Sequence, residues 1–340
     1  MQIYLAPLEG ITTYVYRRAY EHHFGGVDRY FTPFIVNRKM AKKEIAGILP
    51  ENNPGKELIP QIMSNKAEDF LQVAKEIATY GYDTVNLNVG CPSGTVVSKK
   101  RGAGFLAYPD ELDAFLSEIY EKCPIKISIK TRIGLEDEKE WEKILAIYEK
   151  YPMEELIIHP RLRSDFYKGA IRKDAFAKAL GQIKVPICYN GEINSVEDFV
   201  RIKEEFSQVD RIMLGRGILR HPELLAQIRS YTHCKNIEDA KKNPIFNCCS
   251  DEIPGENTRI EALTGTDVEN EIKKRLRAFH DETYAGYREI MPGDKNTLFK
   301  MKELWSYMGE SFPGAEKQIK QIKKANRLIE YENAVNSILH

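Results

Sequence analysis

Short segments rich in β-branched and aromatic residues recur along the first two thirds of the chain, and segments with helical periodicity separate most of them. A helical segment between two strands is the connection that a parallel sheet requires. Eight strands in such alternation are typical of a (β/α)₈ barrel, in which the sheet closes on itself and helices surround it. The predicted strands are Ile3–Ala6, Tyr30–Val36, Leu58–Met63, Thr84–Val89, Lys126–Thr131, Leu156–His159, Pro186–Asn190 and Arg211–Leu214.

The last third of the chain follows a different pattern. Residues 230–266 are rich in Asn, Asp, Pro and Gly, which is typical of a linker. Beyond them, apolar residues recur only at the three- and four-residue spacing of amphipathic helices. The sequence therefore predicts an α/β fold, a TIM barrel with a C-terminal all-helical domain. We place the barrel at residues 1–235, and the linker with the helical bundle at residues 236–340.

Composition limits the classes of partner and compartment. The chain carries 50 Lys and Arg against 50 Asp and Glu, so any site for a polyanion must be a local patch. It has no apolar stretch near the roughly 20 residues that cross a bilayer, and its N-terminus lacks the features of a signal peptide. The cysteines form no Cys-x-x-Cys pair, and Cys248-Cys249 has no neighbouring ligand spacing, so we predict no metal site. We expect a monomer in a reducing cytoplasm, with no membrane partner.

Polar side chains stand at the C-terminal ends of the predicted strands. In barrels of this kind the catalytic groups lie there, because the loops converge on one mouth. A strand buried on both faces has little reason to carry Lys, His, Gln or Asn unless these groups meet a ligand or each other. The residues at these positions are Pro7-Leu8-Glu9, Gln61, Asn88 with Cys91, Lys130, His159, Asn190-Gly191-Glu192 and Gly215-Arg216-Gly217.

Two features of these strand ends suit flavin mononucleotide (FMN). Glycines follow the last two predicted strands, whose loops commonly hold a phosphate in such barrels, and Arg216 adds a positive charge there. Lys130 would supply the cation that stabilises an anionic reduced flavin, and side-chain amides would bind the pyrimidine edge of the ring. Other interpretations stay open: Lys130 as a Schiff-base lysine, His159 as a core residue, and residues 215–217 as a simple turn.

Cys91 is the first candidate for chemistry. It lies between Gly90 and Pro92, directly after the fourth predicted strand, and Pro92 cannot continue that strand. A cysteine in such a turn is exposed, whereas free cysteines usually pack in a core. The other cysteines keep that ordinary interpretation.

These motifs, in this order, resemble the tRNA-dihydrouridine synthase family of bacteria along the whole chain. The short N-terminus and the Asn-Gly-Glu variant resemble the C-type synthases of this family. Two departures stand out: Pro160 replaces the usual Gly, and the basic run 99–101 replaces a glycine-rich segment of several relatives. The matching motifs are Leu5-Ala6-Pro7-Leu8-Glu9-Gly10, Asn88-Val89-Gly90-Cys91-Pro92-Ser93 with Val96 and Gly102-Ala103, Lys130-Thr131-Arg132, His159 with Arg161, Asn190-Gly191-Glu192-Ile193 and Gly215-Arg216-Gly217.

The resemblance implies an FMN-dependent oxidoreductase that reduces specific uridines in tRNA to 5,6-dihydrouridine, with NADPH as the reductant. Reduced flavin would give a hydride to C6 of the base, and Cys91 would act as the general acid at C5. A thiol, with a reference pKa of about 8.5, stays protonated near neutral pH. The uridine must leave its stack to reach the barrel mouth. The residues assigned to the flavin are Pro7, Leu8, Gln61, Lys130, His159, Asn190, Glu192, Gly215 and Arg216, and position at the strand ends adds Glu9 and Gly191.

Cations directed at RNA phosphates are expected around the mouth and on the helical domain. Asn88, three residues before the thiol, is expected to hold the base. The basic C-terminal helix has an alternative interpretation as an ordinary solvated face. The residues predicted to contact RNA are Lys99, Lys100 and Arg101 after the fourth strand, Arg161 and Arg163 after the sixth, and Lys320, Lys324 and Arg327 near the C-terminus.

Two other functions stay open at this point. A flavin barrel that acts on free pyrimidines, of the dihydroorotate dehydrogenase kind, would share the barrel site, although the helical tail and the basic loop argue against it. A non-catalytic tRNA-binding module would share the cations and lack the flavin. The motifs do not encode which uridine is modified.

Overall fold

The computed structural model describes the chain except for residues 37, 243, 245–264 and 340, so the Cys248-Cys249 pair lies outside the described residues. The chain divides into two compact units. The first consists of Met1–Glu9, Asp28–Gly191 and Phe206–Leu214, and the second of Gly10–Val27, Glu192–Glu205 and Gly215–His340. The domain boundary at residue 235 stays a prediction.

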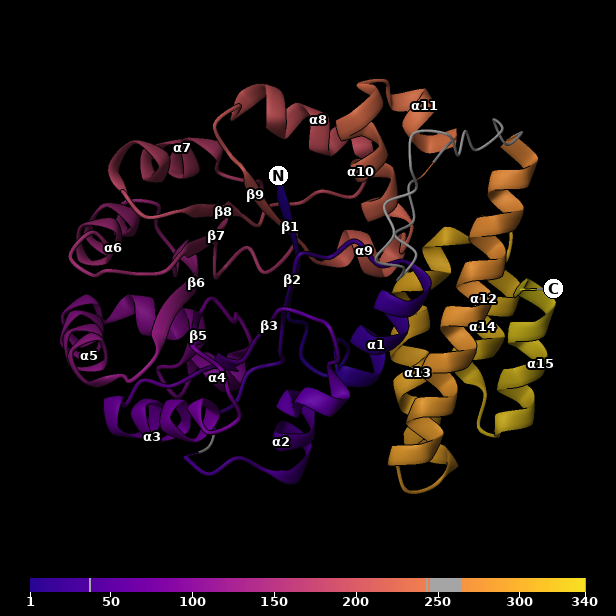
Figure 1. The fold of residues 1–340 in the computed structure, drawn as a ribbon, viewed down its shortest axis with the longest axis horizontal. Coiled ribbons are helices and arrows are strands. Elements are labelled where there is room, and N and C mark those ends of the chain that lie inside the picture. Colours follow the sequence, from indigo (N-terminus) through magenta and orange to yellow (C-terminus); the bar gives the residue numbers. More distant parts are fainter. Residues whose placement is uncertain (37, 243, 245–264, 340) are drawn as a thin grey trace. The chain divides into compact units, whose positions relative to one another are not determined.

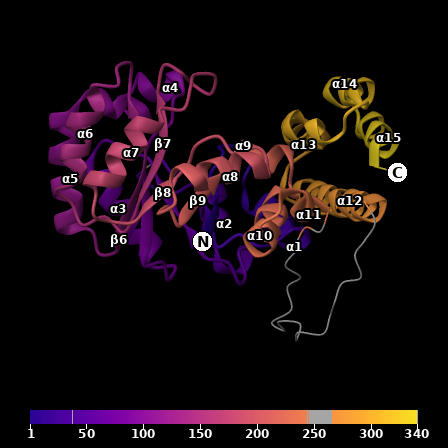
Figure 2. The same cartoon turned by 90° about the horizontal axis from the view of Figure 1, so that it is seen from above.

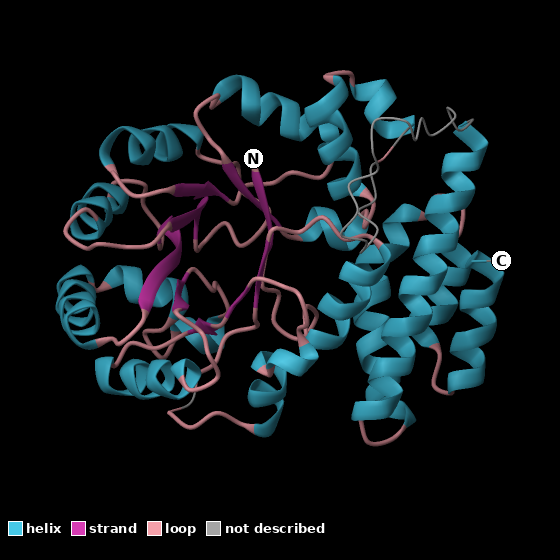
Figure 3. Cartoon of the chain, viewed as in Figure 1, coloured by secondary structure: helices cyan, strands magenta, loops and turns pink. Residues whose placement is uncertain are grey.

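The first unit is built on one parallel sheet (Figures 1 and 3). Its strand order is β3-β2-β1-β9-β8-β7-β6-β5-β4. The two ends of this order, β3 and β4, are halves of one segment separated only by Pro60, so the sheet closes into a barrel. The strands are β1 (Gln2–Leu5), β2 (Arg29–Phe31), β3 (Leu58–Ile59), β4 (Gln61–Ile62), β5 (Thr84–Val89), β6 (Lys126–Gly134), β7 (Leu156–Leu162), β8 (Ile187–Tyr189) and β9 (Arg211–Leu214).

Pro60 explains why the third predicted strand is two strands in the structure. Proline has no backbone N–H to donate to a ladder. Before it, Ile59 accepts a hydrogen bond from the N–H of Thr32 at 3.2 Å; at Pro60 itself, the carbonyl accepts one from Asn86 at 2.9 Å. The two halves therefore pair with different neighbours, β2 and β5, and this switch closes the barrel.

The sixth predicted strand is longer than expected, because β7 passes through Pro160 to Leu162. Pairing with β8 covers only Leu156 to Ile158, while pairing with β6 continues beyond that point. Pro160 therefore lies where β7 has a strand partner on one side only, and its missing N–H costs no ladder bond on the other side.

Helices with one apolar face cover the barrel. In α3, Phe70, Val73, Ala74 and Ile77 recur at helical spacing and are all buried, while Glu68 and Asp69 in the first turn complement the helix dipole. The helices of the first unit are α2 (Lys42–Ile48), α3 (Ala67–Ala78), α4 (Gly94–Val97), α5 (Pro109–Lys122), α6 (Glu140–Tyr148) and α7 (Lys173–Gln182), with 3₁₀ turns at Pro50–Asn52 and Gly102–Ala107.

The barrel interior is packed with side chains. They form a buried cluster that consists of Tyr4, Ala6, Phe31, Ile59, Ile157, Cys188 and Met213. Leu8, which follows β1, packs against this cluster on the side of the C-terminal ends of the strands. The predicted fold class, a TIM barrel with a C-terminal helical region, is confirmed.

Every regular element in the described residues of the second unit is a helix. Phe279 of α12 packs edge-on against Tyr16 of α1, with ring centroids 5.4 Å apart, and α13, α14 and α15 lie together in Figure 2. No described helix is long and apolar enough to span a bilayer. The helices are α1 (Tyr14–His23), α8 (Val196–Glu205), α9 (Arg216–Arg220), α10 (Leu224–Cys234), α11 (Ile237–Lys242), α12 (Gly265–Ile290), α13 (Asp294–Met308), α14 (Glu316–Lys324) and α15 (Leu328–Leu339).

Candidate active site

Neighbouring strands bring three of the predicted site residues side by side at one end of the barrel. Asn88 on β5 is the register partner of Lys130 on β6. Two residues further along β6, Arg132 is the register partner of His159 on β7. The C-terminal ends of these strands therefore form one continuous polar edge, as the sequence predicts.

Gln61 and Asn88 belong to a buried ladder of side-chain amides. The Asn88 Nδ2 donates to Gln61 Oε1 at 2.7 Å, and Gln61 Nε2 donates to Asn86 Oδ1 at 2.7 Å. Asn86 Nδ2 donates in turn to Ser128 Oγ at 2.8 Å. The prediction assigned Gln61 to the flavin and Asn88 to the base, but both amides use hydrogen-bonding groups on each other. Gln61 is fully buried, so its contact with a ligand stays a prediction that this ladder weakens.

Sequence reasoning missed Asn86 and Ser128 as members of this ladder. Both are buried polar residues inside predicted strands. A signal was present, because Asn86 lies two residues before Asn88 and so points to the same face of β5. A buried polar side chain of that kind needs a partner, and its partners here come from neighbouring strands.

The Cys91 turn is held by hydrogen bonds on both sides of its backbone. Asn88 Oδ1 accepts the N–H groups of Gly90 and Cys91, each at 3.0 Å, and the carbonyl of Cys91 accepts the N–H of Ala103 at 3.0 Å. Gly102, at a φ of 54°, makes this approach possible: a Cβ there would lie 2.8 Å from the Cys91 carbonyl oxygen. The side chain of Cys91 is half-buried, so the predicted exposed turn is partly covered.

Electrostatics around the thiol favour its protonated form. Burial raises the pKa of Cys91, and the nearby cations Arg132 and Lys130 oppose this shift only in part. Burial also lowers the pKa of Lys130 to about 8, with a further contribution from Arg132. Within the described residues, no hydrogen bond or ion pair engages the Lys130 ammonium. A half-buried cation without a partner among the described residues is a candidate site for an anionic ligand.

The loop after β7 adds aromatic side chains that the sequence analysis did not select. Tyr167 is 47% exposed and stacks with His159, with ring centroids 6.4 Å apart. Phe166 is 45% exposed, and the Arg163 guanidinium lies 5.0 Å from the centroid of its ring. Adjacent exposed aromatics in a polar loop were the available signal, since exposed large apolar groups mark binding surfaces.

The remaining predicted flavin contacts of the first unit lie at the same end of the barrel. Pro7 is half-buried, and Glu9 is exposed. Asn190 is buried and donates from Nδ2 to the carbonyl of Met213 at 2.8 Å. At Gly191 a Cβ would lie 2.0 Å from the hydroxyl of Tyr189, so only glycine fits there.

The predicted phosphate residues Glu192 and Arg216 belong to the second unit. Arg216 Nη2 donates to Glu192 Oε1 at 2.8 Å, so part of the predicted phosphate fork is engaged by a carboxylate. At Gly217 a Cβ would lie 2.1 Å from the carbonyl oxygen of Ile193, which makes glycine necessary at this close approach. Gly215 is the N-cap residue of α9. The assignment of these residues to a phosphate stays a prediction.

Some of the cations predicted to contact RNA are engaged inside the first unit. Lys100 pairs with Glu111 at 3.1 Å and lies 3.9 Å from the ring centroid of Tyr108. Arg101 Nε donates to the side-chain oxygen of Asn65 at 3.3 Å. Arg161 is buried, whereas Lys99 is exposed.

In the second unit, Lys320 and Lys324 line a surface groove of about 580 Å³ on α14 and α15. Both side chains are exposed, and no hydrogen bond or ion pair holds either one within the described part of the chain. Arg327, by contrast, pairs with Glu330 at 2.7 Å. The basic helix therefore offers two lysines to a ligand without breaking an internal pair.

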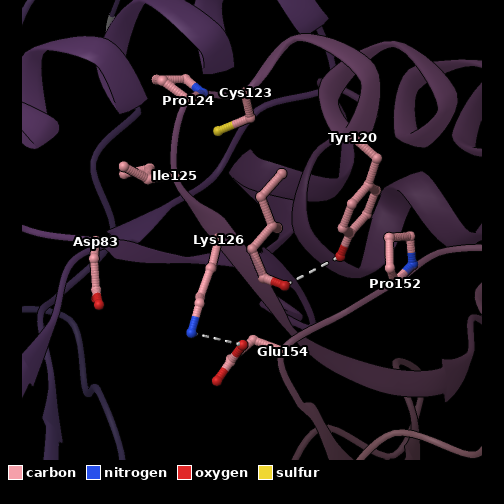
Figure 4. A pocket seen from close by; sticks show the side chains of 9 residues that line it. Asp83, Tyr120, Cys123, Pro124, Ile125, Lys126, Pro152 and Glu154 are labelled. Carbon is pink, nitrogen blue, oxygen red and sulfur yellow. Dashed lines mark hydrogen bonds and ion pairs between the residues drawn. The ribbon is translucent and has the colours of Figure 1, made fainter.

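A separate groove of about 440 Å³ lies where β6 and β7 begin, at the opposite end of these strands from Lys130 and His159 (Figure 4). Its rim carries the ion pair of Lys126 with Glu154, 3.4 Å apart, and the half-buried thiol of Cys123. It contains none of the predicted site residues.

Comparisons with known proteins identify the family of this chain. The family model described as "Dihydrouridine synthase (Dus)" matches residues 4–285. The "tRNA-dihydrouridine synthase B" of Pasteurella multocida is 28% identical over 234 residues, which are 67% of this chain and 69% of that protein. The "tRNA-dihydrouridine(16) synthase" of Pseudomonas putida is 30% identical over 238 residues, 67% of this chain and 73% of that protein. A mutant of morphinone reductase, solved in complex with tetrahydroNAD, has a TM-score of 0.49 and 11% identity over 67% of this chain and 86% of that one. The chain belongs to the dihydrouridine synthase family.

Proposed function

We propose that this protein is an FMN-dependent oxidoreductase that reduces uridines in tRNA to 5,6-dihydrouridine. The observation that carries the proposal is the Lys130 ammonium, half-buried at the end of β6, without a partner in the described residues and close enough to Cys91 to affect the pKa of its thiol. The Lys130 cation suits the anionic ring of a reduced flavin, and the protonated thiol of Cys91 suits a proton donor. Both are needed in a reaction in which the flavin and the acid act on one substrate. Membership in the dihydrouridine synthase family gives the reaction its identity.

The residues present fit a bound flavin. Lys130 would hold the anionic edge of the ring, and Pro7, Leu8, Asn190 and His159 at neighbouring strand ends would contact its faces and edges. Among the further predicted contacts, Gln61, Glu9 and Gly191 belong to the first unit, and Glu192, Gly215 and Arg216, which follow β8 and β9 directly in the sequence, to the second. When bound and reduced by NADPH, FMN supplies the hydride for the reaction.

Cys91 is the general acid in this proposal. Its thiol carries the proton at neutral pH because burial raises its pKa. Asn88 fixes the backbone of the turn that presents this thiol, through the N–H groups of Gly90 and Cys91.

The RNA-binding part of the proposal rests on aromatic and basic side chains. The exposed rings of Phe166 and Tyr167 suit stacking with a nucleobase, as single-stranded or flipped bases require. Lys99 in the first unit and Lys320 with Lys324 in the second are exposed cations for phosphates. A cytoplasmic location, a monomeric state and the use of NADPH are further predictions of this proposal.

The test begins with the purified protein. We expect a yellow protein with one FMN, which forms dihydrouridine in a tRNA transcript when NADPH is supplied. The variant Cys91→Ala should keep FMN and lose uridine reduction by about 10²- to 10⁴-fold, the contribution of general acid catalysis. Cys123→Ala is the matched control, because its thiol is also half-buried and lies in the separate groove. Normal activity of Cys91→Ala would overturn the acid assignment.

The same assay separates the alternatives. Turnover of free uracil or dihydroorotate without RNA would favour a free-pyrimidine enzyme. A colourless protein that binds tRNA, and that takes up no FMN when it is supplied, would favour a non-catalytic module. Mapping of dihydrouridine in tRNA from cells with and without the gene identifies the position that is modified.

A further inference from the structure

The Arg132 side chain joins two loops at the C-terminal end of the barrel. It lies two residues after Lys130 on β6 and is only 1% exposed. Its Nε donates to the carbonyl of Gly90 at 3.0 Å, its Nη1 to the carbonyl of Leu162 at 2.7 Å, and its Nη2 to the carbonyl of Phe166 at 2.6 Å. The first carbonyl belongs to the Cys91 turn, the second to the last residue of β7 and the third to the loop that follows it.

On the Cys91 side, the Arg132 bond completes the fixation of one peptide group. The carbonyl of Gly90 and the N–H of Cys91 belong to the same planar peptide. Arg132 binds the carbonyl, and Asn88 Oδ1 binds the N–H, so both edges of the plane are held. The turn also lies close to β6, since a Cβ on Gly90 would be 3.3 Å from the backbone of Thr131. The direction in which Cys91 leaves the backbone is thereby set.

On the other side, Arg132 holds a loop with an unusual backbone. Phe166 has a φ of 50°, a left-handed conformation that bulky residues rarely adopt without external support. The carbonyl of Phe166 accepts the Nη2 bond, and the Arg132 guanidinium lies 5.4 Å from the ring centroid of Tyr167. Tyr167 stacks in turn with His159, so the arginine reaches the aromatic edge of the site.

The partners of Arg132 are neutral. In the described part of the chain it forms no salt bridge, whereas Arg172 takes the nearby carboxylate of Asp165. Carbonyl oxygens satisfy the directional hydrogen-bonding needs of a guanidinium but leave its charge in place. That charge acts on both Cys91 and Lys130 and lowers the pKa of each group.

We propose that Arg132 is a positioning residue that holds the Gly90–Cys91 peptide and the segment from Leu162 to Tyr167 in one arrangement. The thiol of Cys91 and the aromatic side chains of this segment thereby keep a fixed position relative to each other. This inference rests on the proposed function, because it takes Cys91 as the proton donor. Arg132 belongs to the motif Lys130-Thr131-Arg132, and its sequence position alone predicted no role for it.

The experiment compares Arg132→Met and Arg132→Lys with the parent protein. Methionine keeps an unbranched apolar stem without the charge, while lysine keeps the charge without the planar guanidinium that donates three hydrogen bonds. Lys143→Met is the control, since this cation lies on the surface of α6 and pairs only with Asp110, at 3.0 Å. The measurements are FMN content, kcat and KM for tRNA, and the rate of iodoacetamide reaction at Cys91 against pH, followed by mass spectrometry of its peptide.

We expect both variants to keep FMN and to lose kcat by about 10²-fold, the typical loss when a reacting group is misplaced by about 1 Å. The alkylation profile of Cys91 should move to higher pH in Arg132→Met and move less in Arg132→Lys, because only the former removes the charge. The control should match the parent in every measurement. These two readouts separate loss of geometry from loss of charge.

Parental kcat together with an unshifted alkylation profile in the flavin-loaded variants would overturn the inference. Loss of FMN from both variants would also overturn it, because it would assign Arg132 to folding of the barrel. The proposed function fails separately: if the parent protein reduces no uridine while the alkylation profile still shifts as expected, the positioning of the thiol by Arg132 stands without that reaction.

Discussion

Buried charged side chains differ in their partners between the two ends of the barrel in the first unit. At the N-terminal end of the strands, the Glu155 carboxylate is fully buried and accepts hydrogen bonds from Tyr4 at 2.9 Å and from Arg211 at 2.8 Å, with Arg29 3.8 Å away. At the C-terminal end, Lys130 and Arg132 have no carboxylate partner among the described residues. Charges that pair inside the chain serve the fold, whereas charges that stay unneutralised are available to a ligand.

Glu155→Leu tests the paired end and has the largest expected effect on stability. The change leaves Arg29 and Arg211 without their shared carboxylate, and loss of one partner of a buried ion pair is strongly destabilising. Because both arginines are partly exposed, we expect about 3 kcal/mol, the low end of that range. Urea unfolding measures it. The neighbouring Glu154→Leu, which breaks only a surface pair with Lys126, should cost about 0 to 1 kcal/mol; an equal loss in both variants would contradict the comparison.

Lys130→Met tests the unpaired end. It removes a cation that no described side chain needs, so we expect unfolding stability to stay level or to rise. Uridine reduction should fall by about 10²- to 10³-fold, the effect of removing one electrostatic contact to a reacting group. Lys126→Met, on the same strand and exposed, is the control. If Lys130→Met unfolds as readily as Glu155→Leu, the two ends do not differ in the way we describe.

Tyr331→Phe extends the comparison to the second unit, where the polar side chains of a buried network hydrogen-bond to one another. The Trp305 Nε1 donates to the Tyr331 hydroxyl at 2.9 Å, and this hydroxyl lies 2.6 Å from His280 Nε2. Burial lowers the pKa of His280 and favours its neutral ring, and Nδ1 donates to the Asp281 carboxylate at 2.8 Å, so Nε2 accepts the proton of the Tyr331 hydroxyl. Its removal leaves two buried groups unsatisfied, and we expect a loss of about 1 to 3 kcal/mol in thermal or urea unfolding. Tyr284→Phe, whose hydroxyl is near the surface, should cost less.

The pH dependence of FMN binding gives the smallest expected effect. The pKa of Lys130 is lowered to about 8, so the folded protein loses this charge above that pH while an unfolded lysine keeps it. Folding stability therefore rises with pH above about 8 as far as this group is concerned, and affinity for an anionic flavin falls. We expect the affinity for reduced FMN to weaken by about tenfold per pH unit above 8, measured by anaerobic titration of the protein with reduced FMN. Lys130→Arg, which stays charged, should bind FMN without this dependence.

The sequence predicted the barrel correctly, because apolar periodicity is a property of local segments. It did not predict that Pro60 divides one strand between β2 and β5, since the partner of each half comes from distant parts of the chain. The family was also identified from ordered motifs, which the family model confirms over residues 4–285.

The partners of individual side chains were harder to predict. Lys100 and Arg216 were assigned to ligands from their charge, and each has a carboxylate partner in the structure, Glu111 and Glu192. Arg132 received no role, although it connects more of the site than any predicted residue of its strand. Charge and motif indicate which side chains could bind a ligand. Whether two side chains form an ion pair with each other depends on the distance between the loops that carry them.

By itself, then, the sequence determined the fold class and the family, because both depend on patterns within short segments. Only the tertiary structure decided which polar groups engage one another. Tyr4 and Glu155 are 151 residues apart in the chain, yet they share one hydrogen bond at 2.9 Å. Closure of the barrel creates such neighbours, and so it also decides that Glu155 is paired while Lys130 has no carboxylate partner among the described residues.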